Sequence, residues 1–120
     1  MTPLVYLAGP YRHLDPVENT HAMIRVATRL YATGLVVPLV PHLTLIWHLV
    51  DPQPEAFWYE YDWHLIALCD AVLRLPGPST GADTEVQEAC SLGLPVFQDE
   101  AALLDWAVTA RPQSRSPGLN

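Results

Sequence analysis

Short apolar runs alternate with longer amphipathic stretches along most of the chain. The apolar runs are rich in Val and Leu and are bounded by Gly, Pro or Asp, a pattern typical of buried strands. They occupy residues 4–8, 35–40, 70–75 and 94–97. Pro38 lies inside the second run and has no backbone N–H. That run is therefore predicted to be an edge strand or a short one.

The amphipathic stretches contain helix start and stop signals. Asp15, Pro16 and Glu18 provide an N-cap, a first-position proline and a third-position acid, and Gly34 ends the stripe that follows. Three further helices are predicted: one over residues 56–69, one capped by Ser79 or Thr80, and one that begins at Asp99.

Residues 41–54 fit neither pattern. They are apolar and contain His42 and His48, and we interpret them either as an irregular loop or as a helical turn that folds over another part of the chain. The two histidines are six positions apart and do not share a helix face, so their spacing does not favour a metal site. We expect neither a metal nor a cofactor.

Strands that alternate with helices at this spacing predict an α/β fold with a parallel sheet and right-handed crossovers. In such sheets ligands bind outside the carboxyl ends of the strands, where the strand order reverses. The loops expected there are residues 9–15, the region after Pro41, and residues 76–81. Side chains far apart in the sequence should cluster at this edge: Tyr6, Arg12, Ser79, Gly81 and Glu85.

Two carboxylates lie on predicted inward faces. Asp62 shares a helical stripe with Leu65, Ile66 and Cys69, whereas Glu60 lies off it and is expected to be solvated. An unpaired buried charge is costly, so Asp62 needs a partner or a chemical role. The alternative is that it only complements a helix end.

Glu85 stands out on the helix after Ser79. It lies in phase with the apolar positions of that helix, which are predicted to face inward: Ala82, Val86, Ala89 and Cys90. Asp83 has a structural explanation as the acid of a Thr-x-x-Asp cap. Glu85 has none of this kind, so we expect it to form a carboxylate pair with Asp62 around a sugar, as in retaining glycoside chemistry.

Composition limits the partners. The 120 residues predict one domain over residues 1–110 and a flexible tail over residues 111–120. The net charge of −7 argues against a nucleic-acid polymer, and no apolar run approaches the roughly 20 residues of a membrane span. The start of the chain lacks the pattern of a secretory signal. Cys69 and Cys90 are expected to be buried free thiols, so we expect a cytoplasmic location.

Four segments together resemble the nucleoside 2-deoxyribosyltransferase-like superfamily. They are YLAGPYR at residues 6–12, Asp62 placed eight residues before Asp70, STGADTE at residues 79–85, and EVQEACSLGLPV at residues 85–96. The resemblance covers roughly residues 4–97 and leaves residues 41–58 unmatched. It implies a flavodoxin-like three-layer sandwich, here with a four- or five-stranded parallel sheet, and cleavage of N-glycosidic bonds of nucleosides or nucleotides.

The resemblance also implies roles for the site residues. The glutamate that matches Glu85 is the nucleophile, the aspartate that matches Asp62 assists proton transfer to the departing base, and the tyrosine that matches Tyr6 orients the nucleophile. Serine at the position of Ser79 and arginine at that of Arg12 are typical of the branch that hydrolyses nucleoside 5′-monophosphates. The transferase branch carries an acid in place of Ser79.

The remaining candidates would surround the substrate. We expect Arg12, Ser79 and Gly81 to bind its phosphate, and Gly9 to belong to the substrate-binding site. Aromatic and histidine side chains would form the wall against the base, with core packing as the alternative for each of them: His42, His48, Trp58 and Tyr61.

The predicted function is therefore hydrolysis of a nucleoside 5′-monophosphate to a base and a sugar phosphate through a glycosyl-Glu85 intermediate. One alternative is a nucleoside 2-deoxyribosyltransferase that exchanges bases, and another is a non-catalytic nucleotide-binding or sensing module. A third is a structural α/β domain. The expected partners are a small nucleotide or nucleoside and further copies of the chain in a homodimer or higher homo-oligomer.

Overall fold

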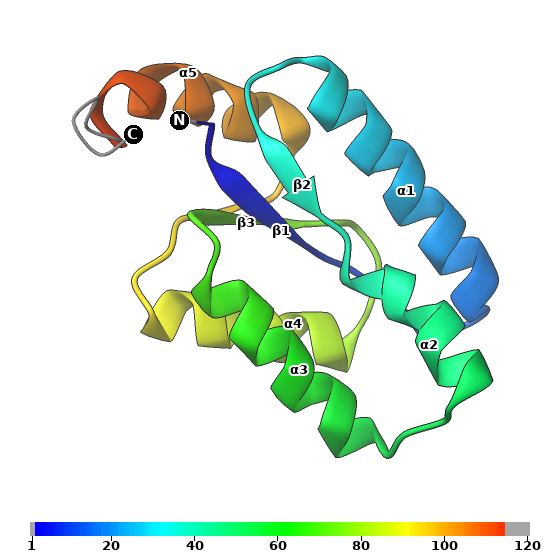
Figure 1. Cartoon of the computed structure of the whole chain (residues 1–120). Coiled ribbons are helices and arrows are strands. Elements are labelled where there is room, and N and C mark those ends of the chain that lie inside the picture. Colours follow the sequence, from blue (N-terminus) through cyan, green and yellow to red (C-terminus); the bar gives the residue numbers. More distant parts are fainter. Residues whose placement is uncertain (1, 115–120) are drawn as a thin grey trace.

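Four parallel strands form one sheet in the order β2–β1–β3–β4 within residues 2–114, which the computed structural model describes (Figure 1). The strands are β1 (Leu4–Ala8), β2 (Val37–Leu39), β3 (Ala71–Arg74) and β4 (Val96–Phe97). The predicted α/β fold with a parallel sheet is confirmed. β2 lies at an edge of the sheet, as predicted. Pro38 is tolerated there, because an edge strand has a neighbouring strand on one side only and the missing N–H breaks no hydrogen bond of a central strand.

Helices cover both faces of this sheet and give three layers (Figure 1). On one face lie α1 (Pro16–Ala32) and α5 (Glu100–Ser114), and on the other lie α3 (Glu55–Ala67) and α4 (Thr80–Ser91). The segment after β2 forms a short 3₁₀ helix (Pro41–Leu43) and then α2 (Thr44–Val50), so the helical interpretation of this region holds.

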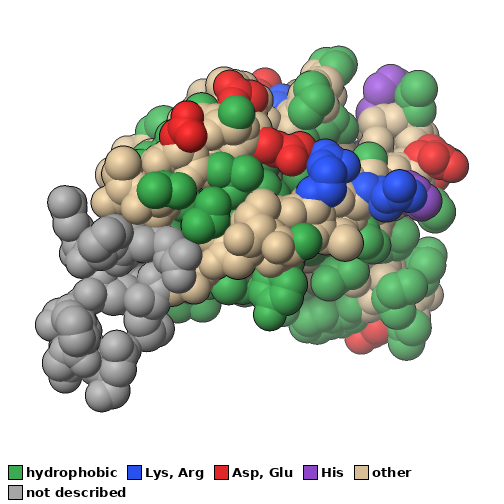
Figure 2. All heavy atoms as spheres, turned by 90° about the horizontal axis from the view of Figure 1, so that it is seen from above, with side chains coloured by type: hydrophobic (Ala, Val, Ile, Leu, Met, Phe, Trp, Pro, Cys, Tyr) green, Lys and Arg blue, Asp and Glu red, His purple; other side chains and the backbone are tan. Residues whose placement is uncertain are grey.

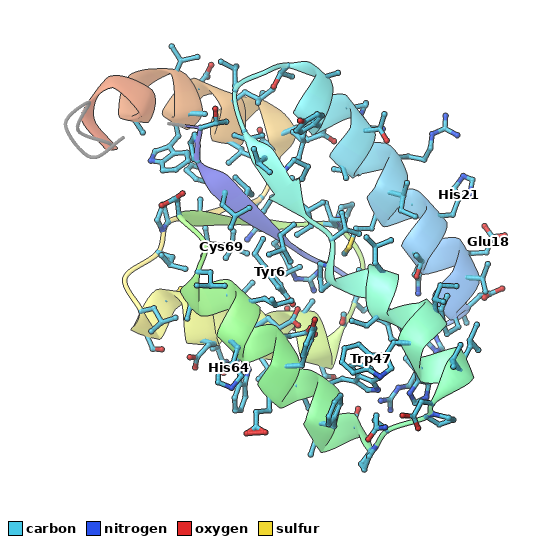
Figure 3. All side chains as sticks on the ribbon, in the orientation of Figure 1. Tyr6, Glu18, His21, Trp47, His64 and Cys69 are labelled. Atoms are coloured by element: carbon cyan, nitrogen blue, oxygen red, sulfur yellow. The ribbon has the colours of Figure 1, made fainter. Side chains whose placement is uncertain are left out.

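Side-chain alternation along β1 divides the core into two layers. Val5 and Leu7 pack with α1 and α5, whereas Tyr6 and Ala8 pack with α3 and α4. All four are completely buried, and burial of one large aliphatic side chain stabilises a fold by about 1.5–3 kcal/mol. Tyr6 therefore points into the layer between the sheet and the helices α3 and α4 (Figure 3). A phenol there needs a hydrogen-bond partner.

The helix starts follow the predicted caps. The backbone N–H of Val17 donates to Asp15 Oδ1 over 2.9 Å at the start of α1. At the start of α4 the cap is Ser79 rather than Thr80, because the N–H of Ala82 donates to Ser79 Oγ over 3.0 Å. These bonds satisfy amides that a helix leaves unpaired in its first turn, which fixes where each loop ends.

Trp47 joins α2 to α3 (Figure 3). Its ring meets the rings of Phe57, Trp58 and Tyr61 on α3, with centroid separations of 5.8, 5.2 and 5.3 Å and edge-to-face geometry. Such aromatic pairs contribute about 0.5–1.5 kcal/mol each beyond their buried area. The aromatic residues of the segment 41–61 thus attach α2 to the layer that contains Tyr6.

The face over α1 and α5 presents acidic, basic and hydrophobic side chains in a mixture (Figure 2). Arg29 of α1 and Glu100 of α5 form an ion pair of 2.7 Å that links the two helices. Both side chains are substantially exposed, and exposed pairs of this kind add little to stability.

Several local expectations need correction. Cys69 is buried, but Cys90 is exposed, because it lies about 100° further round α4 than buried Ala89. Asp83 pairs with Arg74 instead of completing a cap. Residues 111–114, the first part of the predicted tail, belong to α5, and residues 115–120 lie outside the described residues. No helix within residues 2–114 combines the length and apolar character needed to cross a bilayer.

Candidate active site

A cleft of about 290 Å³ lies at the carboxyl ends of β1 and β3, near the lower limit of about 300 Å³ for small-molecule sites. The chain leaves β1 toward α1 on one face of the sheet and leaves β3 toward α4 on the other, so the two loops diverge and leave a crevice. Gly9 lets the strand ends approach closely, because a Cβ there would lie 3.0 Å from the Cβ of Leu75.

Tyr6 and Glu85 meet beneath this cleft. The Tyr6 hydroxyl donates a hydrogen bond of 2.7 Å to Glu85 Oε2. Tyr6 is completely buried and Glu85 is only 7% exposed, between Ala82 and Ala89 on the inward face of α4. The helical phase therefore predicted the position of Glu85 correctly. The phenol supplies the partner that this buried carboxyl requires.

Asp62 is the second carboxyl of the site. It lies on α3 one turn before buried Ile66 and lines the cleft together with Glu85. Its Oδ1 atom is buried and has no hydrogen-bond partner among the described residues. A buried oxygen without a hydrogen-bond partner normally lowers the stability of the folded protein by about 1–3 kcal/mol. This atom is therefore suited to accept a hydrogen bond from a ligand.

Burial raises the pKa values of both carboxyls, and at Glu85 the charge of Asp62 adds to it. Burial is the main cause at Asp62 and raises its pKa to about 6. At Glu85, burial followed by the charge of Asp62 raises the pKa to about 9, against the opposing effect of the hydrogen bond from Tyr6. The pair thus holds one proton near neutral pH. The pKa of Tyr6 also lies well above its usual range, chiefly through burial, so its phenol remains a donor.

The cleft lining includes most of the residues predicted to surround the substrate. It consists of Gly9, Pro10, Tyr11, Arg12, His13, Pro41, His42, Thr44, Glu55, Trp58, Tyr59, Asp62, Pro78, Ser79, Thr80, Gly81, Ala82 and Glu85. The structure thus brings Gly9, Arg12, Ser79 and Gly81 together with both acids. His48 and Tyr61 do not belong to this lining.

His48 instead forms a hydrogen bond with Trp58. Trp58 Nε1 donates a hydrogen bond of 2.9 Å to His48 Nδ1, so His48 fixes the indole that lines the cleft. His42 lines the cleft directly, and its Nε2 lies 2.8 Å from the carbonyl oxygen of Pro10. Burial lowers the pKa of His42. A neutral His42 that donates to Pro10 provides a rigid, uncharged wall, and the edge-to-face contact with Tyr11 extends it.

Glu55 and Tyr59 are cleft residues that the sequence predictions missed. Tyr59 Oη donates to Glu55 Oε2 over 3.0 Å, and Arg12 forms an ion pair with the same oxygen. The helical period contained a usable signal, because Glu55, Trp58 and Tyr59 precede Asp62 by seven, four and three positions on α3. They therefore share its face.

Arg74 fixes the loop between β3 and α4 from the side away from the cleft. Its side chain is only 11% exposed, and its Nη2 atom donates to the carbonyl of Gly77 over 3.0 Å and to Asp83 Oδ1 over 2.9 Å. A further bond reaches the carbonyl of Leu75. The loop that leads to Ser79 is thus tied to α4, and the charge of Arg74 slightly favours ionised Glu85.

The sheet order and the two helical layers define a flavodoxin-like α/β protein. No protein-family model matches the sequence, and no curated protein matches it. Among solved structures the chain is similar to the 2-desoxiribosyltransferase from Leishmania mexicana, with 24% sequence identity and a TM-score of 0.57 over 78% of this chain and 61% of the other. The chain therefore spans somewhat less than two thirds of that enzyme. This likeness confirms the expected nucleoside 2-deoxyribosyltransferase-like fold.

Proposed function

We propose that this protein hydrolyses the N-glycosidic bond of a nucleoside 5′-monophosphate, with Glu85 as the nucleophile. The observation that carries the proposal is the hydrogen bond from Tyr6 to Glu85 beside the buried carboxyl of Asp62. A retaining glycosidase needs one ionised and one protonated carboxyl at its reaction centre. A pair that holds one proton near neutral pH meets that requirement when this proton passes from Glu85, the group with the higher pKa, to Asp62, which leaves Glu85 ionised and Asp62 protonated.

In the first step a carboxylate oxygen of Glu85 attacks C1′ of the sugar while the bond from C1′ to the base nitrogen breaks. Asp62 gives its proton to the departing base, which keeps that base from leaving as an anion. Tyr6 orients Glu85 and, by donating to it, favours the ionised form. The product of this step is a glycosyl ester on Glu85 with Asp62 ionised.

In the second step water attacks C1′ of the ester and gives a proton to Asp62. The bond from C1′ to the Glu85 oxygen breaks, so Glu85 returns as a carboxylate and the sugar phosphate is released. Both carboxyls recover their starting protonation. A second base that replaces the water would give base exchange instead.

The phosphate would bind between the loop after β1 and the start of α4. Arg12 and Ser79 line the cleft there, and Gly81 lies in the first turn of α4, where the helix dipole and unpaired amides favour an anion. Gly81 leaves room beside Tyr59, since a Cβ at this position would lie 3.4 Å from Tyr59 Oη. An acid at the position of Ser79 would repel a phosphate, whereas a hydroxyl can donate to one.

The second candidate is a nucleoside 2-deoxyribosyltransferase. The structural neighbour is a 2-desoxiribosyltransferase, and the carboxylate of Glu55 in the cleft suits an uncharged sugar end better than an anion. A reaction that contains one nucleoside and a different free base separates the candidates. Formation of the exchanged nucleoside supports the transferase.

We also propose that the protein forms a homodimer or higher homo-oligomer in the cytoplasm. Large apolar side chains of the 3₁₀ helix and α2 are strongly exposed: Leu43, Ile46, Leu49 and Val50. Exposed apolar surface of this kind is typical of protein contacts. Light scattering after size exclusion measures the mass directly, and a monomer for both the wild type and Val50→Glu contradicts the proposal.

The direct test of the reaction is chromatography of free bases after incubation with the common ribo- and deoxyribonucleoside 5′-monophosphates and the matching nucleosides. We expect base release by the wild type and its loss in Glu85→Gln. Glu88→Gln, on the same helix but outside the cleft lining, is the matched control and should remain active. Release of no base from any of these compounds contradicts the proposed function.

A further inference from the structure

Arg12, Glu55 and Tyr59 form a cluster at one wall of the cleft. Arg12 comes from the loop after β1, whereas Glu55 and Tyr59 lie one helical turn apart on α3. Arg12 Nη2 and Tyr59 Oη both donate to the same oxygen of Glu55. The guanidinium that should meet a substrate phosphate therefore already has a carboxylate partner inside the chain.

This cluster adjoins the place where a phosphate would bind. Tyr59 Oη lies next to Gly81 in the first turn of α4, so Tyr59 connects Glu55 to that turn. Glu55, Arg12 and Gly81 all line the same cleft. A phosphate that contacts Arg12 and the start of α4 would thus approach the negative charge of Glu55.

We propose that Glu55 is a specificity-determining residue that competes with the substrate phosphate for Arg12. This inference rests on the proposed function, because it concerns nucleotide binding at that site. In the unliganded protein Glu55 holds Arg12 against α3. A bound nucleotide phosphate takes over Arg12, and the charge of Glu55 then opposes the anion. Glu55 therefore reduces the preference for a nucleotide over the matching nucleoside.

The exposure of the ion pair makes this exchange possible. The side chains of Arg12 and Glu55 are 70% and 49% exposed, so both ends are hydrated and the pair is weak. A dianionic phosphate offers Arg12 more charge and more acceptor oxygens than one carboxylate does. Tyr59 remains as a donor that holds Glu55 on α3 after Arg12 has moved.

The test measures dissociation constants for the common nucleoside 5′-monophosphates and their matching nucleosides, in the Glu85→Gln background so that no ligand is consumed. We expect Glu55→Gln to tighten monophosphate binding about fivefold, equivalent to about 1 kcal/mol, and to leave nucleoside binding nearly unchanged. Glu60→Gln removes the same charge from an exposed position of α3 outside the cleft, and it should change neither constant.

A double-mutant cycle with Arg12→Met tests whether the effect acts through Arg12. We expect most of the gain from Glu55→Gln to disappear when Arg12 is absent, because no cation remains to compete for. An equal gain in both backgrounds would overturn the proposal, as would an unchanged ratio of nucleotide to nucleoside affinity or binding of neither ligand. Tighter monophosphate binding by Glu55→Gln, without base release by the wild type, would support the role of Glu55 and contradict the proposed reaction. Base release by the wild type, with an unchanged ratio of nucleotide to nucleoside affinity in Glu55→Gln, would support the reaction and contradict the role of Glu55.

Discussion

The phenol of Tyr6 donates a 2.7 Å hydrogen bond to the carboxyl of Glu85, a residue 79 positions further along the chain. Tyr6 reaches this position because alternation along β1 turns it toward α3 and α4, and Glu85 reaches it because helical phase turns it toward the sheet. Two independent periodicities, of strand and of helix, thus converge on one bond inside a cleft. The reaction proposed for the site depends on this convergence.

Removal of the Tyr6 hydroxyl should impair catalysis more than folding. We expect Tyr6→Phe to lower kcat by about 10- to 100-fold, since a hydrogen bond to a charged group is worth about 1.5–3 kcal/mol. The Tyr6 hydroxyl lowers the pKa values of both carboxyls, so both limbs of the pH–rate profile should also shift to higher pH in this variant. Tyr31→Phe, at an exposed position of α1, is the control for both measurements. A lower kcat without any shift of the profile would assign Tyr6 to orientation alone.

The carboxyl pair predicts a bell-shaped dependence of kcat/KM on pH. Activity should fall below pH of about 6, where both carboxyls are protonated and no nucleophile remains. It should fall again above pH of about 9, where both are ionised and no acid remains to protonate the base. Initial rates of base release in buffers of constant ionic strength measure this profile. A rate that is flat from pH 5 to 10 would argue against an acid–nucleophile pair.

The same pair should lower stability as the pH rises. The pKa values of Asp62 and Glu85 are raised in the folded protein, whereas an unfolded chain has values near 4, so the folded state binds protons more tightly. Their contribution is fully present below pH of about 4 and is lost as the pH rises through the folded-state values. We therefore expect Glu85→Gln to be more stable than the wild type, by a margin that grows from pH 5 to pH 9. Urea unfolding measures the difference, and Glu60→Gln should show no such trend.

Arg74 should matter more to stability than its ion-pair partner does. Arg74→Met removes the bonds to the carbonyls of Leu75 and Gly77 as well as the contact with Asp83, and we expect a loss of roughly 1–3 kcal/mol in the free energy of unfolding. Asp83 is 67% exposed, so Asp83→Asn should cost only about 0–1 kcal/mol. Equal losses for the two variants would show that the ion pair, and not the carbonyl contacts, holds the loop.

Features with a local physical cause could be predicted from the sequence. Pro38 indicated an edge strand because a missing donor is a local property, and Asp15 marked a helix start for the same reason. The inward phase of Glu85 followed from the apolar positions around it. The resemblance in four segments implied the flavodoxin-like form of this fold and the roles expected of the site residues, which the periodicities alone left open.

Partners joined across the fold were not predictable in this way. The pair of Arg12 with Glu55 and that of Arg74 with Asp83 depend on where two elements meet, which no local pattern specifies. Cys90 was predicted to be buried because the inward face of its helix was assumed to include both Ala89 and Cys90. Helix α4 buries a narrower face, which includes Ala89 but not Cys90. Residues 41–54 gave no clear period because α2 is short and its apolar side chains remain largely exposed.

The pairing of Tyr6 with Val72 in the ladder between β1 and β3 has a consequence for how the site can fail. Side chains change sides with every residue of a strand, so a slip of β1 by a single position would turn the phenol into the layer of α1 and α5. Glu85 would then face an aliphatic side chain. Formation of the reaction centre therefore depends on the correct register of β1. A chain with the wrong register would be inactive even if it were compact.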